Sequence, residues 1–484
     1  MLSRTIPPAQ TKAIHVYGAK AVIDGALASA RSFIDSKSSI VNIGNENGLL
    51  WPLFFSANPT HVDQYEIDTC ATALGFAATL GLEGGNNPSP QEFITQSLIT
   101  LISLRRPDGS WPSIQVRPEA GPQAEMEGVV NDTIYALHAL VDGGYLEGPQ
   151  SSRQPNFPES MKKHRIFATR VTWLKSTILW IQKNRLNRGW YYTSTEFMAD
   201  KTQYQPAVGP TASMVLILDR LAGELNSFSF SEETTILVSL RDEAIAWLRE
   251  VQHESGGYGR DSRDLPRVPH TSIALIALTT ANSNDADLSI MRATDWLLSH
   301  ANSRQLNKLD DSDSFDEYSQ AIVFDSKTFR KRIISHEHPI EPLVLRALCS
   351  AIHQQGVSSL GKLGRRARLS ARIFTYIGLV IRRQEKDGAL RGGYLSRRSL
   401  ERERYPVYWL YHTTIALTQA RRLLVDGKIS KIRNIVNSLS VRIGLVLVAG
   451  VAYASFVKND VSQILSITLL GVAANVVSFY FTRE

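Results

Sequence analysis

A two-part motif recurs along the chain, and it constrains the fold more than any other feature. The first part is a turn with Gly and an aromatic residue, found as GLLWP, RRPDGSWP, NRLNRGWYY, QHESGGYG and QEKDGALRGGYL. The second part follows 12 to 21 residues later and is a Thr that opens an apolar stretch: Thr69, Thr133, Thr211, Thr271 and Thr413. A recurrence of this kind indicates that the chain is built from copies of one supersecondary unit.

The spacing of the threonines gives the number of units. Successive threonines are 64, 78, 60 and 142 residues apart, and the last interval is twice 71. We therefore predict a degenerate unit near His338–Ala351 and six units in total. Each unit reads as two helices, of which the first ends at Asp-Gly or Gly-Gly. The second begins with Thr after Asp, Pro or His, and we interpret these residues as caps of its N-terminus.

Six consecutive helix pairs predict an all-α fold without a strand-rich segment. The expected arrangement is a closed double ring with one helix of each pair inside, and an open solenoid is the alternative. We assign residues 1–47 to a helical lead-in, 48–427 to the repeat domain and 428–484 to an apolar tail.

Two of the turns carry a family resemblance. The runs Trp247-Leu248…Gln252…Gly256–Gly259 and Pro107–Trp111 resemble the QW-type repeats of the prenyltransferase/squalene oxidase family, which includes squalene and terpene cyclases and the β subunits of protein prenyltransferases. The resemblance covers about Gly48 to Leu424. It implies an (α/α)₆ toroid with a central cavity for an isoprenoid chain. Because one fold hosts many functions, the repeats alone do not choose the reaction.

Cyclisation of a polyprenyl chain by protonation needs a strong acid in a dry cavity. The DxDD and DCTAE-like motifs that cyclases use for this purpose are absent. The nearest candidates are Asp68 and Asp132, which precede equivalent threonines and would otherwise serve as helix caps. Asp68 is preferred because Glu66, two residues away, would raise the pKa of one of the two carboxyl groups.

Other side chains are candidates for contact with the substrate. Aromatic rings stabilise carbocations by cation–π interaction, although they also fill protein cores. The candidate substrate-binding residues are Trp111, Trp190, Tyr191, His270, Trp409 and His412.

No cofactor is firmly predicted, but two metal sites are conceivable. His412 lies in a Tyr-His-Thr context that resembles the zinc ligand of protein prenyltransferases, and Asp68 and Cys70 form an Asp-x-Cys pair. In a closed ring these three residues would converge on zinc, although their order differs from that of the family. The acidic run Leu309–Glu317 would bind Mg²⁺-diphosphate, but it precedes the fifth inner helix, expected at about 331–349, and a solvated loop is the preferred interpretation.

Positive charge and apolar sequence are concentrated at the C-terminal end. Residues 362–404 hold thirteen Lys or Arg against four Asp or Glu. Their arginines, notably Arg382, Arg383, Arg397 and Arg398, would contact an anionic leaflet or a substrate diphosphate. Nucleic acid is disfavoured because stacking aromatic residues and a reading motif are missing.

The tail predicts a membrane anchor. The runs 443–457 and 461–481 are apolar and are separated by three polar residues, and about 20 apolar helical residues cross a bilayer. Lys428, Lys431 and Arg433 place the preceding side in the cytoplasm by the positive-inside rule. A buried helical hairpin of a soluble domain is the alternative. The expected location is a membrane, with the ring on its cytoplasmic side and membrane lipid or isoprenoid as partner.

Three functions fit these features. The first is a membrane-anchored, cyclase-like enzyme acting on a polyprenyl substrate. The second is a non-catalytic toroid that binds a lipid or an unidentified protein partner. The third is a zinc-dependent, prenyltransferase-like enzyme.

Overall fold

The structure is a computed structural model, and it divides into two units that are described separately. The larger unit comprises Met1–Gly356 and Arg372–Arg422, and the smaller comprises Val357–Ala371 and Leu423–Glu484. The described residues are 16–43, 46–51, 54–56, 73, 75–78, 91–112, 128–143, 170–192, 195, 198, 204–226, 231–281, 286–301, 318–325, 330–337, 340–354, 360–384 and 404–426.

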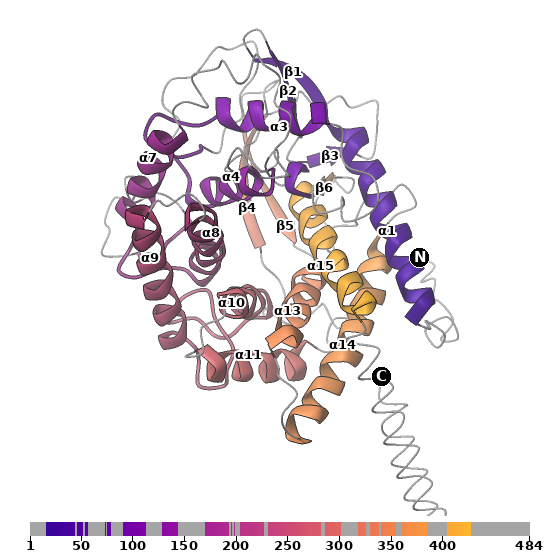
Figure 1. Cartoon of the computed structure of the whole chain (residues 1–484). Helices are drawn as coiled ribbons and strands as arrows, with labels where there is room; N and C mark the ends of the chain where they lie inside the picture. Colours follow the sequence, from indigo (N-terminus) through magenta and orange to yellow (C-terminus); the bar gives the residue numbers. More distant parts are fainter. Residues whose placement is uncertain are drawn as a thin grey trace, which may run out of the picture. The chain divides into compact units, whose positions relative to one another are not determined.

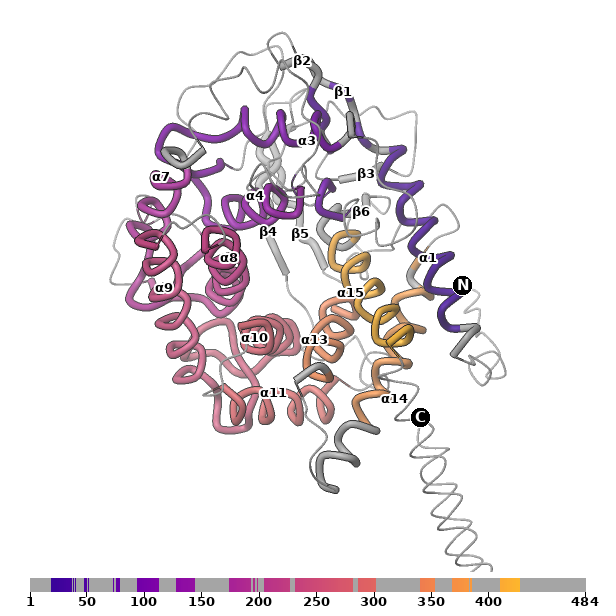
Figure 2. Tube along the Cα trace, in the orientation of Figure 1, coloured from indigo at the N-terminus to yellow at the C-terminus, as the bar shows by residue number. Residues whose placement is uncertain are grey.

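The larger unit consists of outer and inner helices that alternate along the chain (Figure 1). The outer helices are α1 (Val16–Lys37), α3 (Gln91–Ser103), α7 (Arg170–Lys183), α9 (Ser231–Glu250) and α11 (Asp287–His300). The inner helices are α4 (Val130–Asp142), α8 (Val208–Asn226), α10 (Val268–Thr280), α13 (Glu341–Gln354) and α15 (Val407–Val425). Figure 2 shows that the pairs follow one another in sequence order, from purple α3 to yellow α15. Helix α14 (Leu360–Arg383) has residues in both units.

Burial distinguishes the two sets of helices. In α10 every residue is buried except Ile273 and Thr280, which are seven positions apart and share one face. Helix α9, in contrast, buries one stripe that includes Leu240, Trp247 and Leu248 and exposes its other face. A helix that is buried almost all round lies inside a domain, whereas a one-sided helix covers its surface.

Contacts between the two ends of the repeat domain close the ring within the larger unit. Strand β3 (Phe54–Ser56) pairs antiparallel with β6 (Arg404–Pro406), which joins the first turn to the start of α15. The rings of Tyr135 on α4 and Tyr411 on α15 meet edge to face, with centroids 6.4 Å apart. In addition, Arg421 pairs with Asp24 on α1. The closed ring is therefore the arrangement that forms, and the open solenoid is not.

The expectation of a chain without strand-rich segments was wrong. Strands β1 (Ser39–Ile43) and β2 (Glu46–Leu50) form one hairpin, and β4 (Tyr318–Asp325) and β5 (Arg330–Glu337) form another. Residues expected to begin the fifth inner helix thus lie in β5, and α13 begins at Glu341. The physical reason is the composition of these segments, since Ile and Val beside Phe favour a pleated strand.

The sequence suggested that the repeated threonines cap the inner helices, but Thr133, Thr211 and Thr271 have a different role. The residues that precede α4 and α10, Val129 and Arg267, make no side-chain cap hydrogen bond. Instead, the hydroxyl oxygens of Thr133, Thr211 and Thr271 accept the backbone N–H of Trp111, Trp190 and Tyr258, at 3.0, 2.9 and 2.8 Å respectively. We call this contact, between the Thr of an inner helix and the aromatic residue of its turn, the latch. In these three units it fastens the turn to the helix that follows it.

The aromatic side chains of the turns reach back to the outer helices. The indole N–H of Trp111 donates to the carbonyl of Leu101 at 2.7 Å, and that of Trp190 donates to Ile181 at 2.9 Å. Trp51, in the first turn, makes the same contact with Ile34 at 3.1 Å. These side chains are fully buried, so each one holds an outer helix against its own turn.

The degenerate unit predicted near His338–Ala351 is present as α13. The backbone N–H of Val344 donates to the carbonyl of Ile340, as that of Thr133 does to Val129. Val344 therefore occupies the latch position, but it has no hydroxyl group to accept a hydrogen bond. This explains why the sequence motif does not identify this unit, although its inner helix is formed.

The turns also hold neighbouring units together. Gly109 and Gly256 both have φ +97°, and a Cβ on either would collide with the backbone of the next outer helix, at Thr177 and at Arg292 respectively. The amide of Gln252 donates to Gly256 at 2.8 Å and to Ser289 on α11 at 2.9 Å. Glycine is required here both for its conformation and for the close approach.

Within the described part of the chain, no helix is both long enough and apolar enough to cross a membrane. The apolar runs 443–457 and 461–481 lie outside that part. The domain boundaries at 48, 427 and 428 stay predictions.

The latch predicts the effect of removing one hydroxyl group. Thr211→Val keeps the shape of the side chain but leaves the buried N–H of Trp190 without its acceptor, which costs about 1–3 kcal/mol. Urea unfolding of the full chain measures this loss. Thr235→Val on the exposed face of α9 is the matched control and should change stability by less than about 0.5 kcal/mol. Equal effects of the two substitutions would show that the latch does not stabilise the ring.

Candidate functional site

Several residues singled out from the sequence lie outside the described part of the structure. They are Asp68, Cys70, Arg397, Arg398, Lys428, Lys431, Arg433 and the acidic run 309–317; the same holds for the side chains of Arg383 and Trp409. No group of three or more His, Cys, Asp or Glu that could hold a metal ion occurs among the described residues. The zinc and magnesium sites thus stay untested predictions.

Asp132 and His270 occupy the same position in two different units, one residue before the latch threonine. Both side chains are about 5% exposed, and the equivalent residues of α8 and α13, Pro210 and Leu343, are buried as well. His412, which precedes Thr413, is 2% exposed. The position thus accepts acidic, basic and apolar residues, and its common property is burial at the start of an inner helix.

His270 is held in its neutral form. Burial lowers the pKa of its imidazole to about 4, and the nearby guanidinium of Arg267 acts in the same direction. Neither of its ring nitrogens has a hydrogen-bond partner among the described residues. Since a buried imidazole without partners is costly to protonate, this side chain carries no charge at neutral pH.

Two of the predicted aromatic residues, Trp111 and Trp190, are buried and hold outer helices against their turns through the hydrogen bonds of their indole N–H groups. The third, Tyr191, is partly exposed on the rim of the ring, where its ring meets that of Tyr204 with centroids 5.2 Å apart. Arg260 donates to its hydroxyl at 3.1 Å and lies over the ring of Tyr192. These contacts tie the turn after α7 to the loop before α10.

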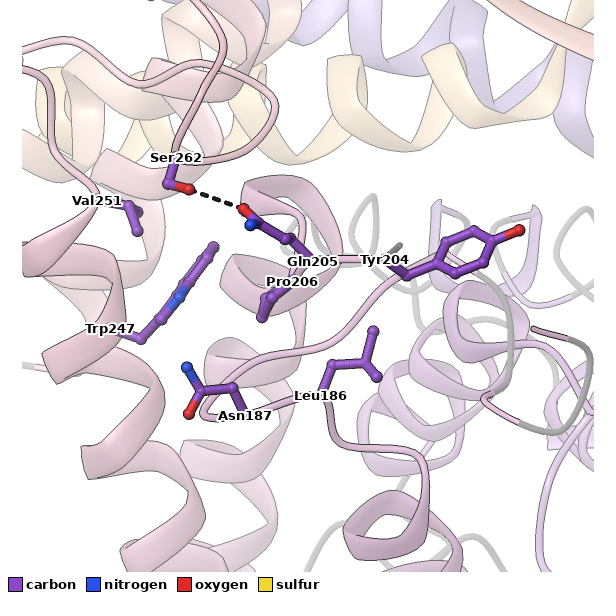
Figure 3. Close-up of a pocket in the computed structure, with 8 residues that line it drawn as sticks. All are labelled: Leu186, Asn187, Tyr204, Gln205, Pro206, Trp247, Val251 and Ser262. Carbon is purple, nitrogen blue, oxygen red and sulfur yellow. Dashed lines mark hydrogen bonds between the residues drawn. The ribbon is translucent and has the colours of Figure 1, made fainter. Parts of the chain in front are cut away.

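A pocket of about 390 Å³ lies beside this aromatic group (Figure 3). It is lined by Leu186, Asn187, Tyr204, Gln205, Pro206, Trp247, Val251 and Ser262. Gln205 and Ser262 face each other through a 2.9 Å hydrogen bond, and the Trp247 ring from α9 faces Pro206. The lining has no ionisable side chain apart from the Tyr204 phenol. This pocket therefore offers shape and amide groups but no acid or base.

The interior of the ring is lined by another set of residues, which the repeat locates. Two residues after each latch position the inner helix has a partly exposed side chain among buried neighbours. These residues are Tyr135, Ser213, Ile273, Arg346 and Ile415. Because the inner helices pack against one another and against the outer helices, the remaining partly exposed stripe faces the interior.

A polar cluster belongs to this interior lining. Arg220 on α8 pairs with Asp142 on α4 at 2.5 Å. Tyr411 on α15 is buried, with Arg346 on α13 as its hydrogen-bonding neighbour. We refer to Asp142, Arg220, Arg346, Tyr411 and the nearby His138 as the interior cluster. Four inner helices contribute to it.

Burial, together with the guanidinium groups of Arg220 and Arg346, holds the pKa of His138 well below its usual range. The ring is therefore neutral at pH 7 and accepts or donates a hydrogen bond without adding charge. Apart from Tyr411, which belongs to the Tyr-His-Thr context of His412, none of the five residues stood out in the sequence. The signal that could have found them is their distance from the latch: two residues for Arg346, and nine for Asp142 and Arg220.

Comparison with known proteins finds solved structures of low similarity. A type II terpene cyclase from Scytonema, solved with geranylgeranyl dihydroxybenzoate, has a TM-score of 0.46 and 14% identity, with 84% of this chain and 99% of that chain covered. An ent-copalyl diphosphate synthase from Streptomyces platensis has a TM-score of 0.39 and 12% identity over 72% of this chain and 50% of that chain. A family 76 mannosidase from Bacteroides thetaiotaomicron has a TM-score of 0.47 and 8% identity over 84% and 99%.

No family model matches the sequence, and no curated protein matches it either. The solved structures that resemble this chain include both terpene cyclases and a glycoside hydrolase.

His270 predicts how stability depends on pH. The imidazole titrates near 6.5 in the unfolded chain and near 4 in the folded one, so only the unfolded chain takes up the proton between these values. Stability is complete above pH 6.5 and falls as the pH decreases towards 4, by about 3 kcal/mol in total.

The matched variant is His270→Leu, since Leu343 occupies the equivalent position of α13. Urea unfolding between pH 4 and 7 should show a loss in the unsubstituted chain that is about 3 kcal/mol larger than in the variant. Parallel pH profiles would contradict a buried neutral imidazole.

Proposed function

We propose that this chain is an isoprenoid-binding toroid that acts as a terpene- or squalene-cyclase-like enzyme on a polyprenyl substrate. The observation that carries the proposal is the amphipathic lining of the ring. Tyr135, Ile273 and Ile415 give it an apolar and aromatic side, and the interior cluster gives it a charged side. A polyprenyl compound with a polar end has the same division along its length.

The structure describes one of the two candidate acids, Asp132, whereas the other, Asp68, is supported by the sequence alone. Asp132 lies in the first turn of α4, one residue before the latch, and its side chain is buried. A carboxyl group that is shielded from water in this way meets one requirement for a proton donor to an alkene. Asp68 precedes the corresponding threonine of the first unit, and its role rests on the sequence. The type II terpene cyclases among the solved neighbours make the reaction class a natural first assay.

A second candidate function is a non-catalytic toroid that binds a lipid or a protein. The observation in its favour is the position of Asp132, because Pro210, His270 and Leu343 fill the equivalent place in other units. A site at which such different residues are tolerated is explained by packing alone.

The proposed activity is tested with purified full chain and farnesyl diphosphate, geranylgeranyl diphosphate and squalene, with products identified by mass spectrometry. If Asp132 is the acid, Asp132→Asn should lower turnover by about 100-fold or more without changing the melting temperature. Asp242→Asn on the exposed face of α9 is the control and should leave turnover unchanged.

The outcomes separate the candidates. A large loss in Asp68→Asn with turnover intact in Asp132→Asn assigns the acid to the first unit. Turnover that survives both substitutions excludes both acids. Absence of product from every isoprenoid favours the non-catalytic toroid.

We also propose that the tail anchors the ring to a membrane, with the ring on the cytoplasmic side and Arg382 close to the anionic leaflet. The support is the sequence of the runs 443–457 and 461–481, together with the exposure of Arg382 on α14. The anchor would bring the ring close to apolar substrates dissolved in the bilayer.

Deleting the chain from Ile435 onward should release the protein from membranes and leave its helical circular dichroism and melting temperature unchanged. Cell fractionation followed by circular dichroism checks both parts. A truncated protein that stays with the membrane fraction, or that melts much earlier, would show that the tail is not a simple anchor.

A further inference from the structure

We infer that Arg346, together with Tyr411, forms a binding site in the ring interior for an oxyanion, a carboxylate or phosphate group of a ligand. The two side chains come from α13 and α15, and a hydrogen bond joins them. Neither belongs to the candidate acids or to the latch.

The position of Arg346 directs it into the ring. It lies two residues after Val344, which takes the latch position in α13, and the equivalent residues include Ile273 and Ile415. In the other units this interior place is thus occupied by an uncharged side chain. A guanidinium at the same place is a departure from the repeat that packing does not require.

The charge of Arg346 is not balanced by a carboxylate in the described part of the chain. Its neighbour Arg220 is paired with Asp142 at 2.5 Å, whereas no ion pair involves Arg346 among the described residues. The Nε atom of Arg346 is buried and has no hydrogen-bond partner there. A guanidinium whose Nε–H is buried without an acceptor is better satisfied when an anion is bound.

The surroundings of Arg346 suit an oxyanion rather than a cation. Tyr411 accepts a hydrogen bond from Arg346 and keeps its own hydroxyl proton available for a ligand oxygen. A planar guanidinium binds two oxygens of one carboxylate or phosphate at once, which fixes the orientation of the ligand.

The interior cluster is reachable from solvent on one side. The side chains of Arg220 and Asp142 are 35% and 27% exposed, whereas Tyr411 is only 4% exposed. An anion bound between Arg346 and the buried Tyr411 is partly shielded from water, which strengthens charge–charge attraction. Asp142 and the nearby Glu224 both act on Arg220, which leaves Arg346 as the cation that attracts the ligand.

The test uses the full chain and two small probes, inorganic pyrophosphate and benzoate, measured by isothermal titration calorimetry. The wild-type protein should bind at least one of them, and the preferred probe identifies the source as phosphate or carboxylate. Arg346→Gln should weaken this binding about 10-fold or more, as expected for the loss of charge-assisted hydrogen bonds. Tyr411→Phe, which removes only a hydroxyl group, should weaken it by a smaller factor.

Arg263→Gln is the matched control, because its side chain is 64% exposed in the loop before α10, and it should bind as the wild type does. If Arg346→Gln does not fold, Arg346→Lys keeps the charge but loses the paired geometry and should still bind more weakly. The inference is overturned if the wild type binds neither probe at millimolar concentration, or if the Arg346 and Tyr411 variants bind unchanged. Both probes lack an isoprenoid chain, so the result does not depend on the proposed cyclase activity.

Discussion

A hydroxyl oxygen that accepts one backbone N–H is the contact on which the ring depends. Thr133, Thr211 and Thr271 each hold the aromatic residue of the preceding turn, so that an outer helix, a turn and an inner helix become one unit. A buried N–H requires an acceptor, and the threonine supplies it without charge and with a methyl group for the core. The motif therefore recurs because the backbone, not a ligand, requires it.

The same turns also pack each unit against the next one. Gly256 lies against the backbone of α11, and Gln252 donates to Ser289 of the same helix. The pairs Arg185–Glu243 and Arg188–Glu250 connect the turn after α7 to α9. Exposed ion pairs add little stability, and we assign the main effect to the close backbone approach, which only glycine permits.

Much of the fold could be predicted from the sequence, because its signals are local and repeated. The turn-and-threonine motif located the units of α4, α8, α10 and α15, and its spacing located a further unit as α13. The role of the threonines was misread, since a Thr near a helix start is usually a cap, and only the structure shows that its partner lies 13 to 22 residues earlier. Strand β5 was missed because the repeat period favoured a helix there. The interior cluster was missed because His138, Arg220, Arg346 and Tyr411 are scattered along four helices and converge only when the ring closes.

The pairing of β3 with β6 has a consequence for how such a protein can vary. An open array of repeats can gain or lose a member, because its ends are free and are protected by special terminal repeats. Here the first and last units cover one another, so no capping unit is needed. An added or deleted pair would change the circumference and separate the two strands. Folding must also wait until about 350 residues of intervening chain have been made, which is a contact of very high sequence separation. The number of units is thus fixed by geometry, and change is confined to the interior residues that the closed ring leaves unconstrained.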